Sequence, residues 1–282
     1  MPANIFDYQF AFKAEGAGKH FLQEGFPRSY QLSTRLHGMK RNPRIVGILQ
    51  ARTGSTRLPA KVLAAICGKP MVSIILDRLS DSKTLDTLVL ATTLLETDDE
   101  LARLAEVLRI PYYRGSENDV LDRYYEAAVF FRADVVVRLT GDNPFVDGRF
   151  VDEAVHCFLD SQPQPDYVTS EEGGFPLGLS AEVFSFSSLE RAWREDKNPA
   201  WREHVTPFIY SHPDLFSVKR MISEEDLAYM RWTVDTPEDL EFARSVFNHL
   251  GNPRFSYRDA VQLLKQKPEL LEINRHVEQK TL

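Results

Sequence analysis

Three basic side chains surround one short turn in a chain whose formal net charge is −7. The turn lies within 48-ILQARTGSTRLPAKVL-63, and the cations are Arg52, Arg57 and Lys61. Guanidinium and ammonium groups make charge-assisted hydrogen bonds to phosphate oxygens, and a glycine in such a turn leaves backbone N–H groups open to an anion. The sequence therefore predicts a phosphate-binding turn. Gly54 is the glycine of this turn, and Ser55 and Thr56 add hydroxyl donors.

The two standard phosphate-binding motifs are absent. G-x-x-x-x-G-K-[ST] fails because 68-GKP-70 has proline where the hydroxyl residue belongs, and no G-x-G-x-x-G occurs. A solvated basic loop before Pro59 would have the same composition. The turn nevertheless follows a strand-like apolar run, and ligands of open α/β sheets bind outside the carboxyl ends of strands. That position favours phosphate.

Two aspartates far apart in the sequence are candidate magnesium ligands. Asp142 follows 133-ADVVVRLTG-141 and Asp235 follows 231-RWTV-234, so both are expected at strand ends. Mg²⁺ is usually held by one or two carboxylates together with substrate phosphates. Each residue also has a purely structural interpretation: Asp142 as a turn residue, and Asp235 as the neighbour of the helix cap Thr236. Beside a phosphate-binding turn, the pair predicts a metal site.

The elements that must position these residues alternate between strands and helices. Strands rich in Val, Ile and Leu, separated by helices, are typical of βαβ units and a parallel sheet buried on both faces. After residue 144 the alternation loosens, and strands of mixed orientation are expected. The predicted strands are 45–50, 87–93, 111–115, 133–142, 166–170, 181–186 and 216–221, and the predicted helices are 70–80, 98–110, 118–131, 237–250 and 257–266.

Composition limits the classes of protein to which the chain can belong. The acidic balance, with a pI of about 5.6, argues against a nucleic-acid surface. Cys67 and Cys157 are too few for a disulfide framework, so we expect a reducing, cytoplasmic location. No apolar run approaches the roughly 20 residues that cross a bilayer, so no membrane association is expected. We predict a weakly ordered extension over 1–43 (Met39 being a possible start codon), one domain over 44–267 and a C-terminal tail over 268–282.

The loop and several later segments resemble the sugar-activating cytidylyltransferases, which make CMP-sialic acid and CMP-3-deoxy-manno-octulosonate. The closest resemblance is to the branch named for the spore-coat polysaccharide biosynthesis protein SpsF, whose pattern ARxGSxRLPxK is matched in register. The likeness extends over nearly all of 44–247. The segments that carry it are 50-QARTGSTRLPAKVL-63, 91-ATT-93, 114-RGSENDVLDRY-124, 138-RLTGDNP-144, 182-EVFSFSSLE-190, 202-REHVTPFI-209 and 233-TVDTPEDLE-241.

This resemblance implies a fold and a reaction. The fold is the Rossmann-like nucleotide-diphosphosugar transferase fold, which is GT-A-like, with a mostly parallel central sheet and flanking helices. The implied reaction is Mg²⁺-dependent transfer of CMP from CTP to an acidic sugar, with release of pyrophosphate, for surface polysaccharide or glycan synthesis. Residues 51–61 would wrap the triphosphate, with the Ala51 backbone near the base. The implied catalytic residues are Arg52, Lys61 and Asp142, and the implied metal ligands are Asp142 and Asp235.

The second substrate is expected beyond the nucleotide half of the chain. Glu182 is a candidate acceptor of hydrogen bonds from sugar hydroxyls, and Arg202 and His204 are candidates to hold a carboxylate or phosphate of the acceptor. Arg202 and His204 also fit an ordinary exposed helix start. SpsF-like chains usually read GLDxEVF where this chain has 178-GLSAEVF-184, so Ser180 indicates a changed acceptor contact.

Two other functions fit the same residues. A glycosyltransferase on a similar nucleotide-sugar fold is one, although those enzymes usually hold their metal through an Asp-x-Asp pair that 141-GDNP-144 lacks. A non-catalytic nucleotide-binding protein is the other. Because the related synthetases dimerise, a homodimer is expected by analogy. The residues themselves specify neither the base nor the sugar.

Overall fold

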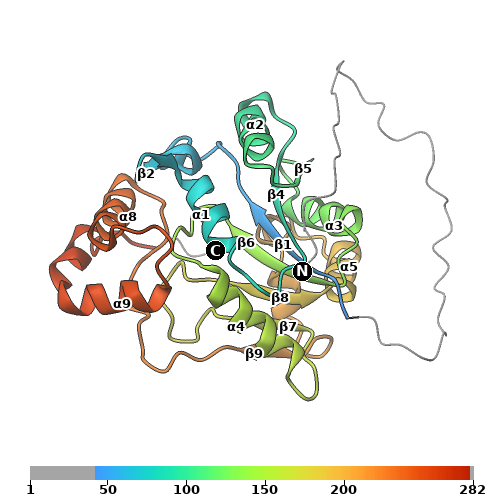
Figure 1. The fold of residues 1–282 in the computed structure, drawn as a ribbon. Coiled ribbons are helices and arrows are strands. Elements are labelled where there is room, and N and C mark those ends of the chain that lie inside the picture. The colour runs from blue at the N-terminus through green and yellow to red at the C-terminus, as the bar shows by residue number, and fades with distance from the viewer. Residues whose placement is uncertain (1–41, 280–282) are drawn as a thin grey trace, which may run out of the picture. The chain divides into compact units, whose positions relative to one another are not determined.

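A seven-stranded sheet runs through the centre of the molecule in this computed structural model, which describes residues 42–279 (Figure 1). The expected extension over 1–43 lies outside the described residues except for its last two. Along the sheet the strand order is β5-β4-β1-β6-β8-β7-β9. The strands are β1 (Ile45–Gln50), β4 (Thr87–Thr93), β5 (Tyr112–Gly115), β6 (Val135–Thr140), β7 (Tyr167–Thr169), β8 (Glu182–Ser185) and β9 (Val218–Arg220).

The sheet is mostly parallel, as predicted. β5, β4, β1 and β6 pair in parallel, β8 is antiparallel to both of its neighbours, and β7 pairs in parallel with β9. Only β8 therefore runs against the others. As a result, the carboxyl ends of β1, β6 and β7 and the amino end of β8 meet at one edge, which is where the predicted site residues lie.

Helices pack on both faces of the sheet (Figure 1). Side chains of β1 and β6 alternate between two apolar cores: Leu49 and Val137 enter one, and Ile48 and Val136 enter the other. The first core includes α1 (Met71–Leu79), α2 (Asp99–Leu108), α4 (Gly148–Leu159), α8 (Pro237–Leu250) and α9 (Tyr257–Gln266). The second includes α3 (Val120–Phe130), α5 (Phe186–Glu195) and α7 (Pro207–Tyr210), with α6 (Pro199–His204) packed against it.

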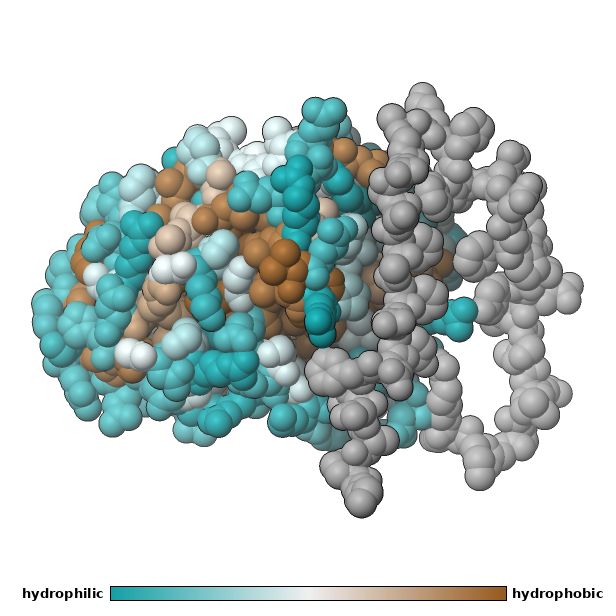
Figure 2. Space-filling model, turned by 45° about the horizontal axis from the view of Figure 1, so that its top comes forward, coloured by the Kyte–Doolittle hydropathy of each residue, from teal (hydrophilic) through white to brown (hydrophobic). Residues whose placement is uncertain are grey.

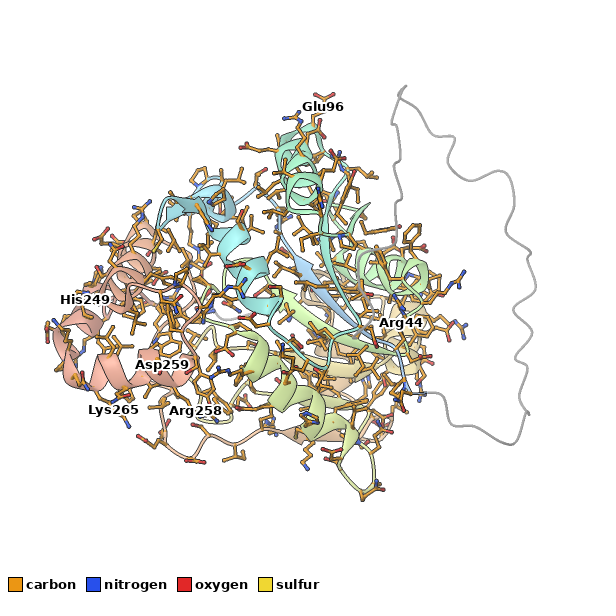
Figure 3. The ribbon with its side chains drawn as sticks, in the orientation of Figure 1. Arg44, Glu96, His249, Arg258, Asp259 and Lys265 are labelled. Atoms are coloured by element: carbon orange, nitrogen blue, oxygen red, sulfur yellow. The ribbon has the colours of Figure 1, made fainter. Side chains whose placement is uncertain are left out.

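Short elements complete the chain. Three 3-10 helices lie at η1 (Lys61–Leu63), η2 (Glu96–Asp98) and η3 (Pro268–Ile273), and β2 (Ala65–Ile66) pairs with β3 (Lys69–Pro70) in a second, two-stranded sheet. Charged side chains such as Glu96, Arg258 and Lys265 lie at the periphery (Figure 3). The face turned forward in Figure 2 is mostly hydrophilic, with hydrophobic residues gathered near its middle. None of the helices within residues 42–279 has the length and apolarity to cross a bilayer.

The elements differ from the expectation in two ways. Residues 231–234 do not form a strand; they contribute one isolated bridge, between Leu177 and Arg231. Helices α4, α5 and α7 were not predicted, although Asp147 caps the amino end of α4 by accepting hydrogen bonds from the Arg149 and Phe150 amides.

The expected tail after residue 267 is packed over its described part. Leu270 of η3 is 8% exposed and joins the first core. Asn274 is buried, and its Nδ2 donates to the Arg231 carbonyl at 3.0 Å and to Asp239 Oδ1 at 2.9 Å. The packed body therefore continues beyond the expected boundary at 267.

Candidate functional site

The basic turn and the two aspartates meet at one edge of the sheet. Lys61 Nζ lies 2.9 Å from Asp142 Oδ2 and 2.8 Å from Asp235 Oδ1. Arg57 Nη2 lies 3.0 Å from the same Asp235 oxygen. Three segments far apart in the sequence thus bring four of the predicted residues into one chain of ion pairs, in which Lys61 contacts both aspartates and Arg57 contacts Asp235.

Burial and charge both act on this cluster. The Lys61 side chain is 12% exposed, and burial by itself would lower the pKa of its ammonium, but the Asp142 and Asp235 carboxylates outweigh burial and raise the pKa. Burial would raise the pKa of Asp235, and the charges of Lys61, Arg57 and Arg231 instead lower it. Lys61 is therefore charged and Asp235 ionised at neutral pH.

Arg231 fixes Asp235 from the other side. Its Nη2 donates to Asp235 Oδ2 at 3.0 Å, and its Nε donates to Asp239 Oδ1 at 2.9 Å. Asp239 also completes the capping box of α8 by accepting from the Thr236 amide. The cap is predictable from the sequence, but Arg231 is not, because its role depends on contacts that no local pattern indicates.

Asp98 anchors the start of the turn and was also missed. Its Oδ1 accepts from the Thr53 amide at 2.8 Å and from Thr53 Oγ1 at 2.7 Å, and its other oxygen accepts from Thr93 Oγ1. Asp98 is 1% exposed; burial would raise its pKa, and the hydrogen bonds of Thr93 and Thr53 lower it below the usual value. A buried ionised carboxylate thus ties the turn to the end of β4.

The backbone of the turn leaves room beside its glycine. A Cβ added at Gly54 would meet no heavy atom within 4 Å. By contrast, a Cβ at Gly141, just before Asp142, would lie 2.9 Å from Ala51 Cβ and 3.0 Å from the Gln50 carbonyl oxygen. The close approach of β1 and β6 thus requires glycine at position 141, whereas Gly54 is exposed and has open space beside it.

The remaining residues of the turn differ in whether their polar groups already have partners within the protein. The Ala51 amide donates to the Ala91 carbonyl at 3.0 Å, and Ser55 Oγ accepts from the Leu58 amide at 3.5 Å. Thr56 is exposed. Arg52 is turned away from the aspartates: Nη2 lies 3.5 Å from Glu203 Oε1 and Nη1 lies 4.0 Å from Glu117 Oε1.

The predicted acceptor residues have contrasting environments. Glu182 is 2% exposed, forms an ion pair with its cross-strand partner Arg138, and accepts from Tyr167 Oη and, at 2.6 Å, from Thr206 Oγ1. It is therefore placed inside the protein at the edge of the site.

Arg202 is held by the protein itself. Its guanidinium donates to Asp119 Oδ2 at 2.9 Å through Nε and to the carbonyls of Trp193 and Asp196, both at 3.0 Å. His204, two residues later, is half-buried, and burial followed by the charge of Arg138 lowers the pKa of its imidazole. His204 is therefore neutral at physiological pH. Neither residue offers a free cation.

The carboxylate pair suits a divalent cation that arrives with phosphate. Asp142 and Asp235 already enclose one cationic group, the Lys61 ammonium, and carboxylate oxygen is the ligand type that Mg²⁺ prefers. Asp142, with a side chain 31% exposed, is the more accessible of the two. Among residues 42–279, no cluster of three or more His, Cys, Asp or Glu side chains could hold a metal ion by itself. Phosphate oxygens would therefore have to complete the ligand set.

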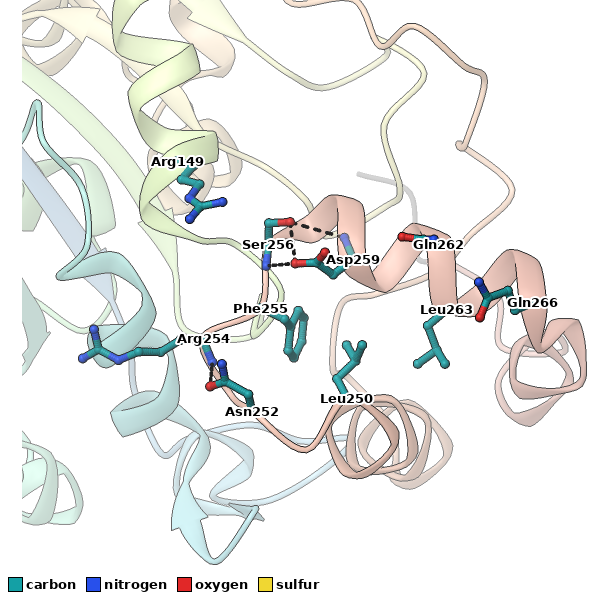
Figure 4. A pocket seen from close by; sticks show the side chains of 10 residues that line it. All are labelled: Arg149, Leu250, Asn252, Arg254, Phe255, Ser256, Asp259, Gln262, Leu263 and Gln266. Carbon is teal, nitrogen blue, oxygen red and sulfur yellow. Dashed lines mark hydrogen bonds between the residues drawn. The ribbon is translucent and has the colours of Figure 1, made fainter.

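Two hollows lie elsewhere on the surface, and Arg202 is the single predicted site residue that lines either of them. One, of about 430 Å³, lies between α4, α8 and α9 and is lined by Arg149, Leu250, Phe255 and Leu263 among others (Figure 4). The other, of about 570 Å³, is lined by α3 and α5 and includes Arg202. Neither contains Lys61, Asp142 or Asp235.

Comparison with known proteins gives concordant matches. The family model described as "Cytidylyltransferase" matches residues 46–276. An uncharacterized protein from Methanocaldococcus jannaschii is 40% identical over 240 residues, 84% of this chain and 97% of that protein. The spore coat polysaccharide biosynthesis protein SpsF of Bacillus subtilis is 34% identical over 233 residues, 80% and 95% of the two chains. The solved structure of a cytidylyltransferase from Leptospira borgpetersenii superposes with a TM-score of 0.79 at 31% identity, over 85% of this chain and all of that one.

Proposed function

The chain belongs to the cytidylyltransferase family and is a nucleotidyltransferase, and from that premise we propose that it transfers CMP from CTP to a sugar hydroxyl in a magnesium-dependent reaction that releases pyrophosphate. The observation that carries the proposal is the contact of Lys61 with both Asp142 and Asp235. The printed name of the SpsF relative supports a role in surface polysaccharide synthesis.

The reaction is an in-line displacement at phosphorus. The oxygen of the sugar hydroxyl attacks the α-phosphorus of CTP, a new P–O bond forms, and the bond to the β-phosphate oxygen breaks as the hydroxyl proton is lost. Negative charge builds on the leaving pyrophosphate. We expect Lys61 and Arg57, the cations paired with Asp142 and Asp235, to stabilise that charge and hold the phosphates in line. Asp142 and Asp235 are the residues that would hold Mg²⁺, and the ion would supply positive charge that neutralises the same developing charge.

The charges of the cluster explain why the metal would enter with the nucleotide. Three carboxylates, Asp142, Asp235 and Asp239, balance three cations, Lys61, Arg57 and Arg231. Adding Mg²⁺ alone would introduce uncompensated positive charge, whereas a triphosphate supplies compensating negative charge. We therefore expect Lys61 to exchange its carboxylate partners for phosphate oxygens when the magnesium nucleotide binds.

The two alternatives from the sequence analysis are less well supported. A glycosyltransferase would need a preformed nucleotide sugar, and both the family match and the relatives with a printed activity are those of cytidylyltransferases. A binding protein would have no need for the lysine and both carboxylates together. A homodimer stays a prediction.

The proposal is tested by pyrophosphate release with each of the four ribonucleoside triphosphates, Mg²⁺ and a panel of sugars that carry a free anomeric hydroxyl. CTP is expected to be the active nucleotide. Lys61→Ala should reduce the rate by about 10²–10³-fold, the effect of removing one charge-stabilising donor. Lys69→Ala, which removes an exposed lysine of β3, is the matched control. Equal rates for Lys61→Ala and the wild type, or no pyrophosphate with any triphosphate, would refute it.

A further inference from the structure

The two carboxylate oxygens of Asp235 have separate partners. Oδ1 lies 2.8 Å from Lys61 Nζ and 3.0 Å from Arg57 Nη2, and both of these cations belong to the phosphate turn. Oδ2 accepts a hydrogen bond from Arg231 Nη2 at 3.0 Å. The Asp235 side chain is 10% exposed, so water reaches little of it. Each oxygen is therefore occupied by its own set of cations.

The partners of Oδ1 are the ones that a nucleotide would draw away. We expect Lys61 to exchange its carboxylate partners for phosphate oxygens when the magnesium nucleotide binds. We expect the same of Arg57, whose side chain is 31% exposed and therefore able to turn toward a ligand. Oδ1 of Asp235 would then lose both cations that contact it and become available to a metal ion.

Arg231, the partner of Oδ2, is held in place by other contacts. Its side chain is 8% exposed, and its guanidinium forms a fork with Asp239, in which Nε donates to Oδ1 at 2.9 Å and Nη2 donates to Oδ2 at 3.0 Å. Asp239 is completely buried, and Nη1 of Arg231 donates to Gln279 Oε1 at 2.6 Å. Moving Arg231 away from Asp235 would break this fork and leave the buried charge of Asp239 unpaired, which is costly.

A guanidinium fixed at Oδ2 restricts how Asp235 can hold a metal ion. The positive charge of Arg231 repels a cation that approaches Oδ2, and its hydrogen bond already uses one lone pair of that oxygen. Asp142 has no such constraint: Lys61 contacts its Oδ2, and among residues 42–279 no donor is hydrogen-bonded to its Oδ1. Asp235 therefore presents one oxygen to a metal ion, whereas both oxygens of Asp142 are available.

An aspartate that presents one oxygen discriminates between divalent cations. Mg²⁺ demands nearly octahedral geometry, keeps several waters and needs few carboxylate oxygens. Ca²⁺ takes about six to eight oxygen ligands and commonly binds both oxygens of one carboxylate. Withholding Oδ2 of Asp235 thus removes a ligand that Ca²⁺ would use and Mg²⁺ does not need.

Resting on the magnesium-dependent cytidylyltransferase activity proposed above, we propose that Arg231 sets the metal selectivity of the site: it withholds Asp235 Oδ2 from the metal ion and so favours Mg²⁺ over Ca²⁺. Arg231 acts through Asp235 and is therefore a positioning residue. Three hydrogen bonds carry the inference: the one from Arg231 to Asp235 Oδ2 and the two of the fork with Asp239.

The test is calorimetric titration of CTP into the full chain with either Mg²⁺ or Ca²⁺, each at a concentration that saturates the nucleotide. The wild type is expected to bind Mg·CTP more tightly than Ca·CTP. Arg231→Gln, which removes the charge and keeps an amide donor, should lower the ratio of the two affinities about tenfold, and Arg231→Lys, which restores the charge, should keep it within about threefold of wild type. Arg220→Gln is the matched control: this arginine of β9 is exposed and pairs with Glu172, so the ratio should not change.

The outcomes separate this inference from the activity on which it rests. If the wild type binds Mg·CTP and Ca·CTP equally well, the selectivity inference alone is overturned, whether or not the variants fold. A wild-type ratio in Arg231→Gln, even with both affinities reduced, would show a purely structural role and overturn it as well. So would a loss of selectivity in Arg231→Lys as large as that in Arg231→Gln. If the wild type does not bind Mg·CTP, the proposed activity fails and the selectivity inference fails with it.

Discussion

Lys61 lies between two carboxylates that follow it by 81 and 174 residues in the sequence. The sequence indicated this meeting because parallel strands bring their carboxyl ends to one edge, and the lysine and Asp142 each follow a predicted strand. The partners of these residues were not predictable in the same way. Arg231 and Asp98 act through contacts that form only when distant segments pack, and neither lies in a phosphate or metal motif.

Asp98 provides a test of how the turn is held. Asp98→Asn should destabilise the protein by about 1–3 kcal/mol at neutral pH, because the partly buried amide and hydroxyl of Thr53 lose a charged acceptor. The folded pKa of Asp98 lies below the ordinary value of 3.8, so its contribution is full above that value and is lost as the pH falls through the folded pKa. Urea unfolding measured as a function of pH should show that the difference in the free energy of unfolding between wild type and variant narrows below pH 3.8.

Asp99→Asn is the matched control for that experiment. Asp99 is the next residue, its side chain is 38% exposed, and it pairs with Arg114 at the surface. An equal loss of stability in both variants would contradict an anchoring role for Asp98.

Gly54 tests whether the open space in the turn is used. Gly54→Val should leave the free energy of unfolding within about 0.5 kcal/mol of wild type, since Gly54 is exposed and an added Cβ meets no heavy atom within 4 Å. It should weaken the binding of Mg·CTP at least tenfold, because the branched side chain would occupy the space that we assign to phosphate. Unchanged nucleotide affinity with unchanged stability would show that no ligand uses this space.

At the scale of elements, the strands were predictable because buried parallel strands are continuous runs of Val, Ile and Leu. Helix α4 was missed although its apolar residues recur on one face, at 150, 151, 154, 155 and 158, behind the cap Asp147. Residues 231–234 read as a strand but pair irregularly: Trp232 and Thr233 share the Leu177 carbonyl, and the Val234 amide donates to the Asp142 carbonyl. The buried segment joins two loops at the site instead of extending a sheet.

Gly178 is where that segment is most closely packed. Its φ is +95°, and an added Cβ would lie 2.4 Å from the Thr233 nitrogen, so Gly178→Ala combines backbone strain with displacement of the segment that carries Asp235. Thermal unfolding should show that the free energy of unfolding of Gly178→Ala falls by about 1–3 kcal/mol, and Mg·CTP should bind more weakly. Gly251→Ala, with φ +66° and open space, should cost only about 1 kcal/mol and spare nucleotide binding. If both variants lose the same stability and bind Mg·CTP equally well, the packing of Gly178 against the segment that carries Asp235 does not affect the nucleotide site.

At the scale of the whole molecule, the α/β class and the mostly parallel sheet were predictable from the alternation of elements, and the structural similarity confirms the fold. The boundary expected at residue 267 was less predictable, because 268–279 has little periodicity and packs through single contacts. Leu270 fills the first core, and Asn274 and Gln279 bind Arg231 or its partner Asp239.

A chain that ends at Lys267 should therefore lose both stability and nucleotide affinity. Burial of Leu270 alone is worth about 1.5–3 kcal/mol, and Arg231 would lose its contacts with Asn274 and Gln279. The comparison chain ends at Gln279 and keeps every described contact. Chemical unfolding and Mg·CTP titration of the two chains measure the effect. Equal values would show that residues 268–279 are a dispensable tail after all.

Asp142, Asp235 and Lys61 are proposed to enclose the polyphosphate of one magnesium nucleotide. The decisive experiment is calorimetric titration of CTP into the wild type and into Asp142→Asn and Asp235→Asn, each with Mg²⁺ and with EDTA. We expect binding that requires Mg²⁺ in the wild type and falls at least tenfold in both variants, while thermal unfolding shows them folded. CTP binding that is equal with and without Mg²⁺, and unchanged in Asp142→Asn, would contradict it.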